Sequence, residues 1–349
     1  MTRGEPPERL TEASLIRAVR RRVEGGSGVQ VGIGDDCAVL EPTPGTRLIA
    51  TTDLLLEDVH FRRRYAEPAD VGWKALAVNL SDVASMGARP RWALVALACP
   101  ASTTLDEVEA FYAGCLALAA EHGVAVVGGD TSASPAGWLV NITVLGEATR
   151  APLLRSGARA GDIVAVTGGL GRSAAGLAVL ERATAPPGVG AEALAEVTAA
   201  HLRPRPRVAE GQWLAGVGGV TAMMDLSDGL ATDLAHIAEE SGAGARVELE
   251  RVPVAPAARL VAERIGADAL AWATGGGEDY ELLVVCDPEA FPRLHEGSPR
   301  ATGTALTRVG EMTAGTGITF MDAAGRERAV AAGFEHFVTG HRGARDHRR

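Results

Sequence analysis

The chain has 349 residues, of which 46% are hydrophobic and 22% charged, so it can bury a large core without disulfide or metal support. Its net charge of −10 excludes the basic surface that nonspecific nucleic-acid binding requires, and we expect no nucleic-acid partner. The longest apolar run, Trp92 to Cys99, is far shorter than the roughly 20 residues of a membrane span. The charged N-terminus is unlike a signal peptide. We therefore expect a cytoplasmic protein without a membrane partner.

Turn residues and apolar periodicity predict alternating strands and helices in the first 150 residues. In chain order we expect a helix over 10–23, a strand broken by a Gly-Asp turn over 29–40, a strand over 47–56, a helix over 70–90, a strand over 91–100, a helix over 104–123 and a strand pair over 124–132 and 138–148. The irregular alternation favours a mixed sheet with helices packed on it over a doubly wound parallel fold.

An Arg-rich and turn-rich segment over 148–162 divides the chain, so we expect domains over 1–150 and 151–340 and a disordered tail over 341–349. The second half predicts a strand, Gly turn and helix over 162–183, a surface excursion over 184–200, a helix over 208–217, and strands over 245–254, 280–287, 307–313 and 317–323. The expected fold class is therefore α+β or mixed α/β, with an N-terminal mixed sheet and a C-terminal α/β domain.

A short echo links the two halves, because NLSD at 79–82 returns as DLSD at 225–228, 146 positions later (228 − 82). Either the halves are related domains or the match is accidental. The turn TGGLGRSAAG (167–176) has Ala174 where a dinucleotide fingerprint needs its third glycine, so a Rossmann fold is not expected. That turn either contacts a phosphate or only packs.

Metal and nucleotide chemistry is constrained by what the chain lacks. Lys74 is its only lysine, and neither a Walker A loop nor the protein-kinase motifs occur. The four cysteines have no metal or redox spacing, so we expect buried free thiols in a reducing compartment, and the eight scattered histidines argue against zinc. Any bound nucleotide phosphates must be neutralised by other means.

Carboxylates stand in small groups beside glycine or threonine. The groups are Asp35-Asp36 in GIGDD, Asp53 in TTD, Asp82 in NLSD, Asp130 in GGD, Asp225 and Asp228 in DLSD, and Glu278-Asp279 in GGGED. Each group alone is consistent with ordinary turn or capping chemistry. If the strands share a sheet, however, their ends converge, and hard oxygen ligands without His or Cys favour Mg²⁺.

Asp82 is the most informative acidic residue. It lies on a helix that is apolar on nearly every face, and a buried carboxylate must be paired or bind a metal. An ion pair with a distant arginine is the alternative. In the same way His60 is either structural or part of a site, and Arg155 either clamps phosphate or lies on the surface.

The motifs together carry a family resemblance. GIGDDCAVL, TTDLLLEDVHF, WKALAVNLSDVASMGARP, VVGGDT, LLRSGARAGD, HLRPRPR, MDLSDGLATDLAHI and GGGEDYEL occur in this order, and over residues 12–337 the chain resembles the thiamine-monophosphate kinase family. The resemblance implies the two-domain fold of aminoimidazole ribonucleotide synthetase and a homodimer formed by the first domain. It also implies Mg²⁺-dependent, direct in-line transfer of the γ-phosphoryl group of ATP to thiamine monophosphate, which yields thiamine diphosphate and ADP.

Site residues follow from the resemblance motif by motif. It implies several Mg²⁺ ions held by Asp36, Thr51, Thr52, Asp53, Asp82, Asp130, Asp225 and Asp228. It implies ATP contacts from Tyr112, Gly129, Asp130, Arg155 and Ser227, and thiamine monophosphate contacts from His60, Glu278 and Phe334. No side chain is expected to act as a covalent nucleophile.

Two alternatives remain from the sequence. A sister synthetase for aminoimidazole ribonucleotide or selenophosphate shares the expected fold, but GGEDYEL and the lack of a Cys-rich N-terminal loop argue against it. A non-catalytic nucleotide-binding regulator is the other, and the intact carboxylates in every motif argue against that.

Overall fold

The computed structural model describes residues 12–23, 25–331 and 333. The first half contains α1 (Glu12–Arg22), β1 (Val29–Val31), β2 (Val39–Leu40), β3 (Arg47–Leu56), α2 (Pro68–Ser85), β4 (Arg89–Cys99), α3 (Leu105–His122), β5 (Ala125–Ala133) and β6 (Leu139–Ala148). These bounds lie close to the predicted ones because caps and periodicity act locally: Thr104 caps α3 and Gly123 ends it in the left-handed conformation, as expected.

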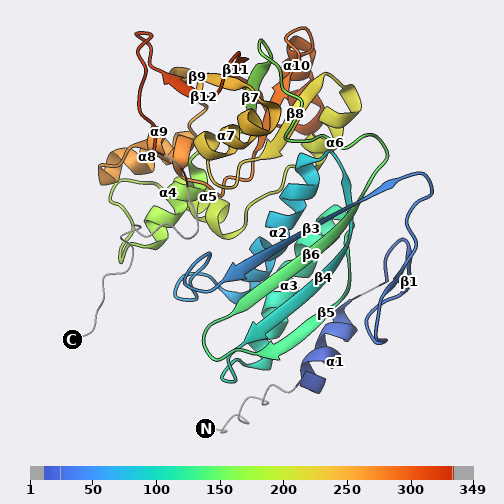
Figure 1. The fold of residues 1–349 in the computed structure, drawn as a ribbon. Coiled ribbons are helices and arrows are strands. Elements are labelled where there is room, and N and C mark those ends of the chain that lie inside the picture. The colour runs from blue at the N-terminus through green and yellow to red at the C-terminus, as the bar shows by residue number, and fades with distance from the viewer. Residues whose placement is uncertain (1–11, 24, 332, 334–349) are drawn as a thin grey trace.

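The N-terminal sheet has four strands in the order β3-β6-β4-β5, with only β4 and β5 parallel. It is therefore the mixed sheet that the sequence predicts. The expected pairing of β5 with β6 is wrong, since β4 lies between them. One face of this sheet is covered by α2 and α3, and the other face is open in Figure 1. A separate hairpin of β1 and β2 projects beside it.

The second half forms a six-stranded mixed sheet in the order β12-β9-β11-β7-β10-β8. Its elements are β7 (Ile163–Thr167), α4 (Arg172–Leu180), α5 (Ala191–Leu202), α6 (Val208–Val217), β8 (Val220–Asp225), α7 (Leu230–Ser241), β9 (Gly244–Glu248), the 3-10 turn η1 (Leu249–Arg251), α8 (Pro256–Ile265), α9 (Ala269–Gly275), β10 (Leu282–Cys286), α10 (Phe291–Thr302), β11 (Leu306–Thr313) and β12 (Gly317–Met321).

Three further sequence predictions need correction. The strand predicted over 245–254 ends at Glu248, because Leu249–Arg251 form the 3-10 turn η1 and Pro253, which has no N–H to donate, follows. The segment 184–200 is not an irregular excursion, because most of it forms α5, and the helix formers Ala, Leu and Glu of Ala191–Leu202 explain this. Cys37 is exposed, whereas Cys99, Cys115 and Cys286 are buried free thiols as expected. The predicted tail over 341–349 lies outside the described residues. Among the residues that the structure describes, no helix is long and apolar enough to cross a membrane.

Helix α2 joins the two halves. It packs on β3, β6 and α3 of the first half and on α6 and β8 of the second. Nearly all of its residues are buried, including the polar Lys74, Asn79 and Ser81. Buried polar side chains cost stability unless they find partners. Lys74 and Ser81 find theirs in the second half, at Glu278 and Asp225, whereas Asn79 donates to the Ala75 carbonyl of the same helix.

Candidate functional site

Strand β3 presents two of the predicted ligands toward α2. Alternation along the strand puts Thr51 and Asp53 on the face that buries Ile49 and Leu55, and the Thr51 hydroxyl donates a hydrogen bond to the Asp82 carboxylate. Thr52 points to the opposite, open face, where its hydroxyl lies 3.0 Å from Thr143 Oγ1. The structure therefore brings Thr51, Asp53 and Asp82 together, and only the backbone of Thr52 lies with them.

The second half adds Asp225 to this group from the end of β8. The Ser81 hydroxyl of α2 donates to Asp225 Oδ2 at 2.6 Å, and both residues are buried. The two copies of the LSD echo thus meet in space. They do not occupy equivalent positions, because NLSD lies inside a helix whereas DLSD ends a strand.

Mutual repulsion perturbs these carboxylates, which we call the acidic cluster (Asp53, Asp82 and Asp225). Burial, and then the charge of Asp82, raises the pKa of Asp53 to about 7. Burial, and then Asp82 and Asp53, likewise raises the pKa of Asp225 to about 7. Burial raises the pKa of Asp82 also, although Thr51 and Arg155 oppose it. Several carboxylates held together without a matching number of cations are a functional-site signature.

The loop after Asp225 is held by a residue that sequence reasoning missed. Asp233 on α7 accepts hydrogen bonds through Oδ2 from the backbone N–H groups of Asp228, at 3.2 Å, and Gly229, at 3.0 Å. Its side chain is fully buried, and Oδ1 has no hydrogen-bond partner among the described residues. The spacing DxxxxD in DGLATD was a signal for it, because a helix brings a residue of its first turn back to the preceding loop.

Two cavities flank the acidic cluster. One of about 470 Å³ is lined by Thr51, Asp82 and Arg155, together with Glu240. Another of about 270 Å³ is lined by residues of both halves, namely Thr52, Asp53, Leu54, Leu55, His60, Lys74, Val78, Glu278 and Tyr280. We call the second one the acceptor pocket. Because β3 contributes to both cavities, ligands in the two would meet at this strand.

Glu278 faces Lys74 in the acceptor pocket. Lys74 Nζ lies 2.7 Å from Glu278 Oε1 and donates to the His60 carbonyl oxygen at 3.2 Å. Burial works to raise the pKa of Glu278, but the charge of Lys74 outweighs it, so the pKa is lowered and the carboxylate is ionised. The Leu56 N–H donates to His60 Nδ1 at 3.0 Å, which leaves the proton of a neutral imidazole on Nε2.

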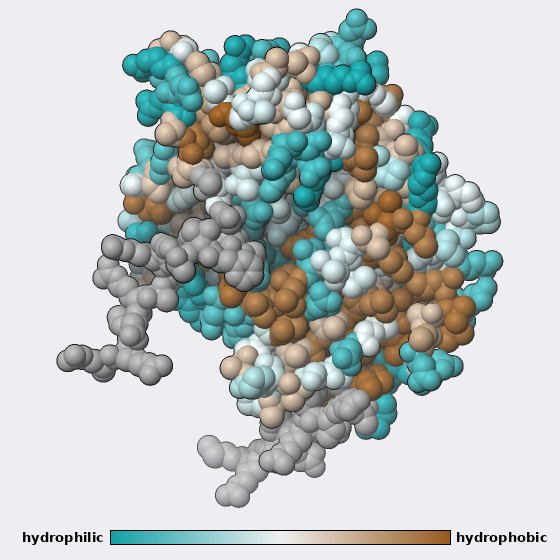
Figure 2. Space-filling view, viewed as in Figure 1, coloured by the Kyte–Doolittle hydropathy of each residue, from teal (hydrophilic) through white to brown (hydrophobic). Residues whose placement is uncertain are grey.

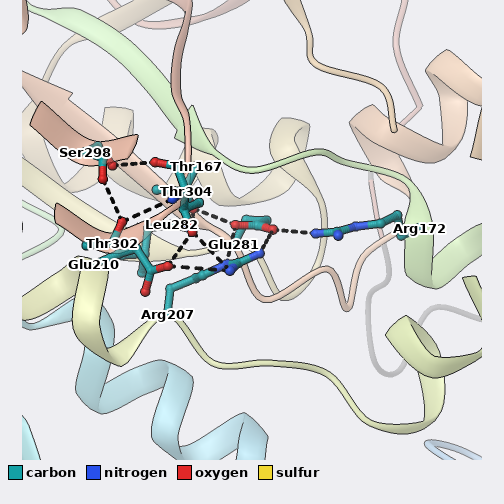
Figure 3. Close-up of polar contacts among 9 residues, drawn as sticks. All are labelled: Thr167, Arg172, Arg207, Glu210, Glu281, Leu282, Ser298, Thr302 and Thr304. Carbon is teal, nitrogen blue, oxygen red and sulfur yellow. Dashed lines mark hydrogen bonds and ion pairs between the residues drawn. The ribbon is translucent and has the colours of Figure 1, made fainter. Parts of the chain in front are cut away.

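The other two acids of GGGEDYEL are structural. Asp279 accepts from the backbone N–H of Gly171 at 2.6 Å and of Ser173 at 3.1 Å, so it occupies the N-terminus of α4. The glycine turn before α4 therefore packs onto a carboxylate through the N–H groups of Gly171 and Ser173, and these two groups are not available to a phosphate. Figure 3 shows Glu281, fully buried, between Arg172 and Arg207, with Thr167 donating to it at 2.7 Å.

The remaining predicted residues lie apart from the acidic cluster. Tyr112, Gly129 and Asp130 line a cavity of about 110 Å³ beside Ile33, on the β5 edge of the N-terminal sheet. Asp36 is exposed on the loop between β1 and β2, and its N–H donates to Asp35 Oδ1 at 2.9 Å. Ser227 and Asp228 are half-buried on the loop that Asp233 holds. Phe334 lies outside the described residues.

The protein side chains alone do not form a complete metal site. Within the described ranges, no group of three or more His, Cys, Asp or Glu side chains is arranged so that it could hold a metal ion. A larger cavity, about 800 Å³, lies along α7 beside β12 and includes only Asp228 of the predicted residues. Cavity size alone therefore does not locate the chemistry, whereas the convergence of perturbed carboxylates does.

Comparison with known proteins agrees with this geometry. The family described as AIR synthase related protein, N-terminal domain, matches residues 34–148, and the corresponding C-terminal domain family matches residues 159–323. The chain is 37% identical over 336 residues to a thiamine-monophosphate kinase of Rhodopirellula baltica, covering 94% of this chain and 98% of that protein. It is 40% identical over 337 residues to one of Salmonella typhimurium, with the same coverage.

Solved structures show the same likeness. The thiamine-monophosphate kinase of Stenotrophomonas maltophilia K279a superposes with a TM-score of 0.79 at 36% identity, covering 90% of this chain and 98% of that one. A structure described as AaThiL complexed with AMPPCP and TMP has a TM-score of 0.74 at 33% identity, covering 95% and 100%. The hydrogenase maturation protein HypE, at 21% identity, shares the fold alone. With this identity over nearly its whole length, the chain belongs to the thiamine-monophosphate kinase family.

Proposed function

We propose that this protein transfers the γ-phosphoryl group of ATP to thiamine monophosphate, forming thiamine diphosphate and ADP. The observation that carries the proposal is the acidic cluster, which both halves of the chain build at the junction of two cavities. Its relatives are named thiamine-monophosphate kinases, and a structural neighbour is described as complexed with AMPPCP and TMP. The reaction needs ATP and thiamine monophosphate to meet at their phosphate ends. Two cavities that both border β3 would allow this arrangement.

Magnesium fits the donor set of this site. Burial, and then carboxylate repulsion, raises the pKa values of Asp53 and Asp225, and a divalent cation would relieve that repulsion. Mg²⁺ takes one or two carboxylates and completes its octahedron with water and phosphate, which matches an open cluster. We propose that the ions are held by Asp36, Thr51, Thr52, Asp53, Asp82, Asp130, Asp225 and Asp228. When bound, they neutralise phosphate charge that the chain's single lysine cannot.

We propose that ATP contacts Tyr112, Gly129, Asp130, Arg155 and Ser227. Arg155 lines the same cavity as Thr51 and Asp82, and its charge acts on both Asp82 and Asp225. An arginine fork suits phosphate oxygens better than a point charge does. Tyr112, Gly129 and Asp130 lie together on another cavity, so their role in ATP binding requires the nucleotide to extend along the N-terminal sheet.

The acceptor would bind through His60, Glu278 and Phe334. Thiamine carries a positively charged thiazolium ring, and the ionised Glu278 is a carboxylate that faces the pocket. The acceptor pocket also contains Asp53, so an acceptor seated there directs its phosphate toward the acidic cluster. Binding of this kind orients the acceptor phosphate, and positioning of the reactants is a main contribution of the protein to phosphoryl transfer.

Transfer is proposed to be direct and in line, without a phosphoenzyme. Asp279 is an unsuitable nucleophile because its two oxygens are engaged by the N-terminus of α4. His60 accepts the Leu56 N–H at Nδ1. The acids of the cluster are better explained as metal ligands.

We further propose that the chain divides at residue 150 and works as a homodimer in the cytoplasm. The two family matches and the two separate sheets support the division. Figure 2 shows apolar residues gathered over the N-terminal sheet, whose open face exposes Leu48 and Leu54. Contiguous exposed apolar surface of this kind is typical of an interface.

An assay of the purified full chain with ATP and Mg²⁺ tests the activity. Thiamine monophosphate should yield thiamine diphosphate and ADP in equal amounts, measured by chromatography, whereas free thiamine should give no product because it lacks the phosphate that the cluster must hold. Equal rates with free thiamine would contradict the proposed acceptor. Nucleotide binding without turnover of either compound would favour a regulator instead.

A further inference from the structure

Lys74 stands out because it is the only lysine of the chain and is almost completely buried. Its side chain is 4% exposed, on the helix that joins the two halves. The ammonium group lies between the Glu278 carboxylate of the second half and the His60 carbonyl of the first half. A buried ammonium costs several kcal/mol in lost hydration unless its partners are well placed, so this contact is specific.

The second oxygen of Glu278 has its own partner. His201 Nδ1, at the end of α5, lies 3.3 Å from Glu278 Oε2 and 3.0 Å from the Ser173 hydroxyl. Burial, and then the charge of Lys74, lowers the pKa of His201 to about 3, so its imidazole is neutral. The hydrogen bond at Nδ1 is the one with Ser173, so His201 lies beside Oε2 as a neutral polar neighbour. Lys74 pairs with Oε1 of Glu278, and His201 is positioned next to Oε2.

The backbone around Glu278 shows why such support is needed. Glu278 and Tyr280 have φ values of 56° and 50°, in the left-handed region that non-glycine residues rarely adopt. The Glu278 N–H donates to the Ser227 carbonyl at 2.7 Å, so the same turn also supports the loop of Ser227 and Asp228. Strained turns persist where surrounding contacts over-determine them.

We propose that Lys74 and His201 are positioning residues for the phosphoryl acceptor: Lys74 pairs with one carboxylate oxygen of Glu278, and His201 packs beside the other, so that the carboxylate stays directed toward the acceptor pocket. The inference rests on the proposed function, because it takes Glu278 as a contact of the acceptor. Lys74 acts across the domain junction, whereas His201 acts from within the second half. This role also gives a function to His201, the first residue of the HLRPRPR motif, to which the proposed transfer reaction assigns no other role.

The effect should fall on acceptor affinity. Lys74→Met keeps the length of the side chain and removes its charge, so Glu278 loses the donor on Oε1. The KM for thiamine monophosphate should rise about tenfold or more, as expected for loss of a charged hydrogen bond, whereas kcat and the KM for ATP should change less than about twofold. His201→Asn should raise the same KM by about threefold or more, since it removes the ring that packs beside Oε2 of Glu278.

A double-mutant cycle separates positioning from general damage. In Glu278→Gln, which itself raises the KM for thiamine monophosphate, adding Lys74→Met should have little further effect, because the group that Lys74 holds is already neutral. The matched control is Arg203→Met, which breaks a different ion pair to α2, between Arg203 just after α5 and Asp70 at 2.5 Å, outside the acceptor pocket. It should leave both KM values within about twofold.

Several results would overturn the inference. They are additive effects of Lys74→Met and Glu278→Gln, an unchanged acceptor KM in Lys74→Met, or a loss confined to kcat or to ATP. If Lys74→Met does not fold, as judged by circular dichroism, Lys74→Arg replaces it. Its planar fork keeps the charge but cannot occupy the same point, so the acceptor KM should still rise about threefold or more, and an unchanged value would refute the role. Failure of the proposed function is distinct, since the unmodified chain would then form no thiamine diphosphate.

Discussion

At the residue scale, Asp53 and Asp225 show how a site can oppose stability. Both carboxylates have a pKa of about 7 in the folded chain against about 3.8 for an exposed aspartate, because burial and neighbouring charges disfavour ionisation. Above pH 7 the folded state must keep these repelling charges together. The same closely spaced negative charges attract a divalent cation. The arrangement of these carboxylates therefore lowers the stability of the folded state and at the same time supplies a cation-binding site.

Asp53→Asn and Asp82→Asn should therefore lower activity and raise stability together. Each should reduce thiamine diphosphate formation at saturating Mg²⁺ by at least about 100-fold, since each removes a charge from the acidic cluster. At pH 8 without Mg²⁺, each should melt about 2 °C or more above the unmodified chain. Asp106→Asn, at an exposed position in the first turn of α3, is the control and should change neither quantity appreciably. A variant that keeps a near-normal rate would remove its residue from the proposed ligand set.

A dependence of Mg²⁺ stabilisation on pH follows from the same pKa values. A raised folded pKa means that the folded state binds more protons than the unfolded state between about pH 4 and pH 7, so stability falls as pH rises through this window. Mg²⁺ competes with those protons. The increase in melting temperature on adding Mg²⁺, measured by calorimetry, should be larger at pH 8 than at pH 5.5. An equal increase at both values would show that the ion binds elsewhere.

At the element scale, the position of α2 depends on two glycines, Gly72 of α2 and Gly114 of α3, which allow the two helices to pack closely. A Cβ atom at Gly114 of α3 would lie 1.9 Å from the Ala69 carbonyl oxygen, and one at Gly72 of α2 would lie 1.9 Å from that of Phe111. No side chain fits at either position. Because α2 carries Lys74, Ser81 and Asp82, this close packing also determines where the site residues stand.

Gly114→Ala should destabilise the chain by about 2 kcal/mol, because overpacking pushes α2 and α3 apart. Denaturant unfolding followed by circular dichroism measures the loss. Gly216→Ala is the matched control, since that glycine lies within α6 with open space around its Cβ position, and there alanine should stabilise by about 0.5–1 kcal/mol. Equal effects of the two substitutions would contradict the role assigned to the close approach.

At the scale of the whole molecule, the face of the N-terminal sheet away from α2 and α3 exposes apolar side chains along β3. Strand β3 turns Leu48 and Leu54 outward, 55% and 46% exposed, while its other face carries Thr51 and Asp53. The proposed dimer interface and the proposed metal site thus lie on opposite faces of one strand. Burying the outer face in a dimer would also hold β3, and therefore the acidic cluster, in place.

Leu54→Asp should convert a dimer into a monomer, because a charge at the centre of an apolar interface loses its hydration without a partner. Light scattering after size exclusion should give twice the mass of one chain for the unmodified protein and a single-chain mass for the variant. Val217→Asp, at an exposed valine of α6 in the other half, should remain dimeric. A monomeric unmodified chain would refute the proposed interface.

The sequence by itself determined the local features of this protein. Caps, glycines and apolar periodicity act within a few residues, so α3, α6 and β3 lie where those signals place them. Motif order likewise identified the family and the hard oxygen donors. The sequence did not reveal α5, because a Pro- and Gly-rich start concealed the strong helix formers that follow.

Only the tertiary structure decided which acids act together. Glu278, Asp279 and Glu281 are near neighbours in the chain, yet one faces the acceptor pocket, one caps α4 and one lies between two arginines. Asp82 and Asp225, far apart in sequence, join one cluster through Ser81. The pKa and role of a carboxylate depend on burial and on charges within a few ångströms, and those neighbours come from distant parts of the chain.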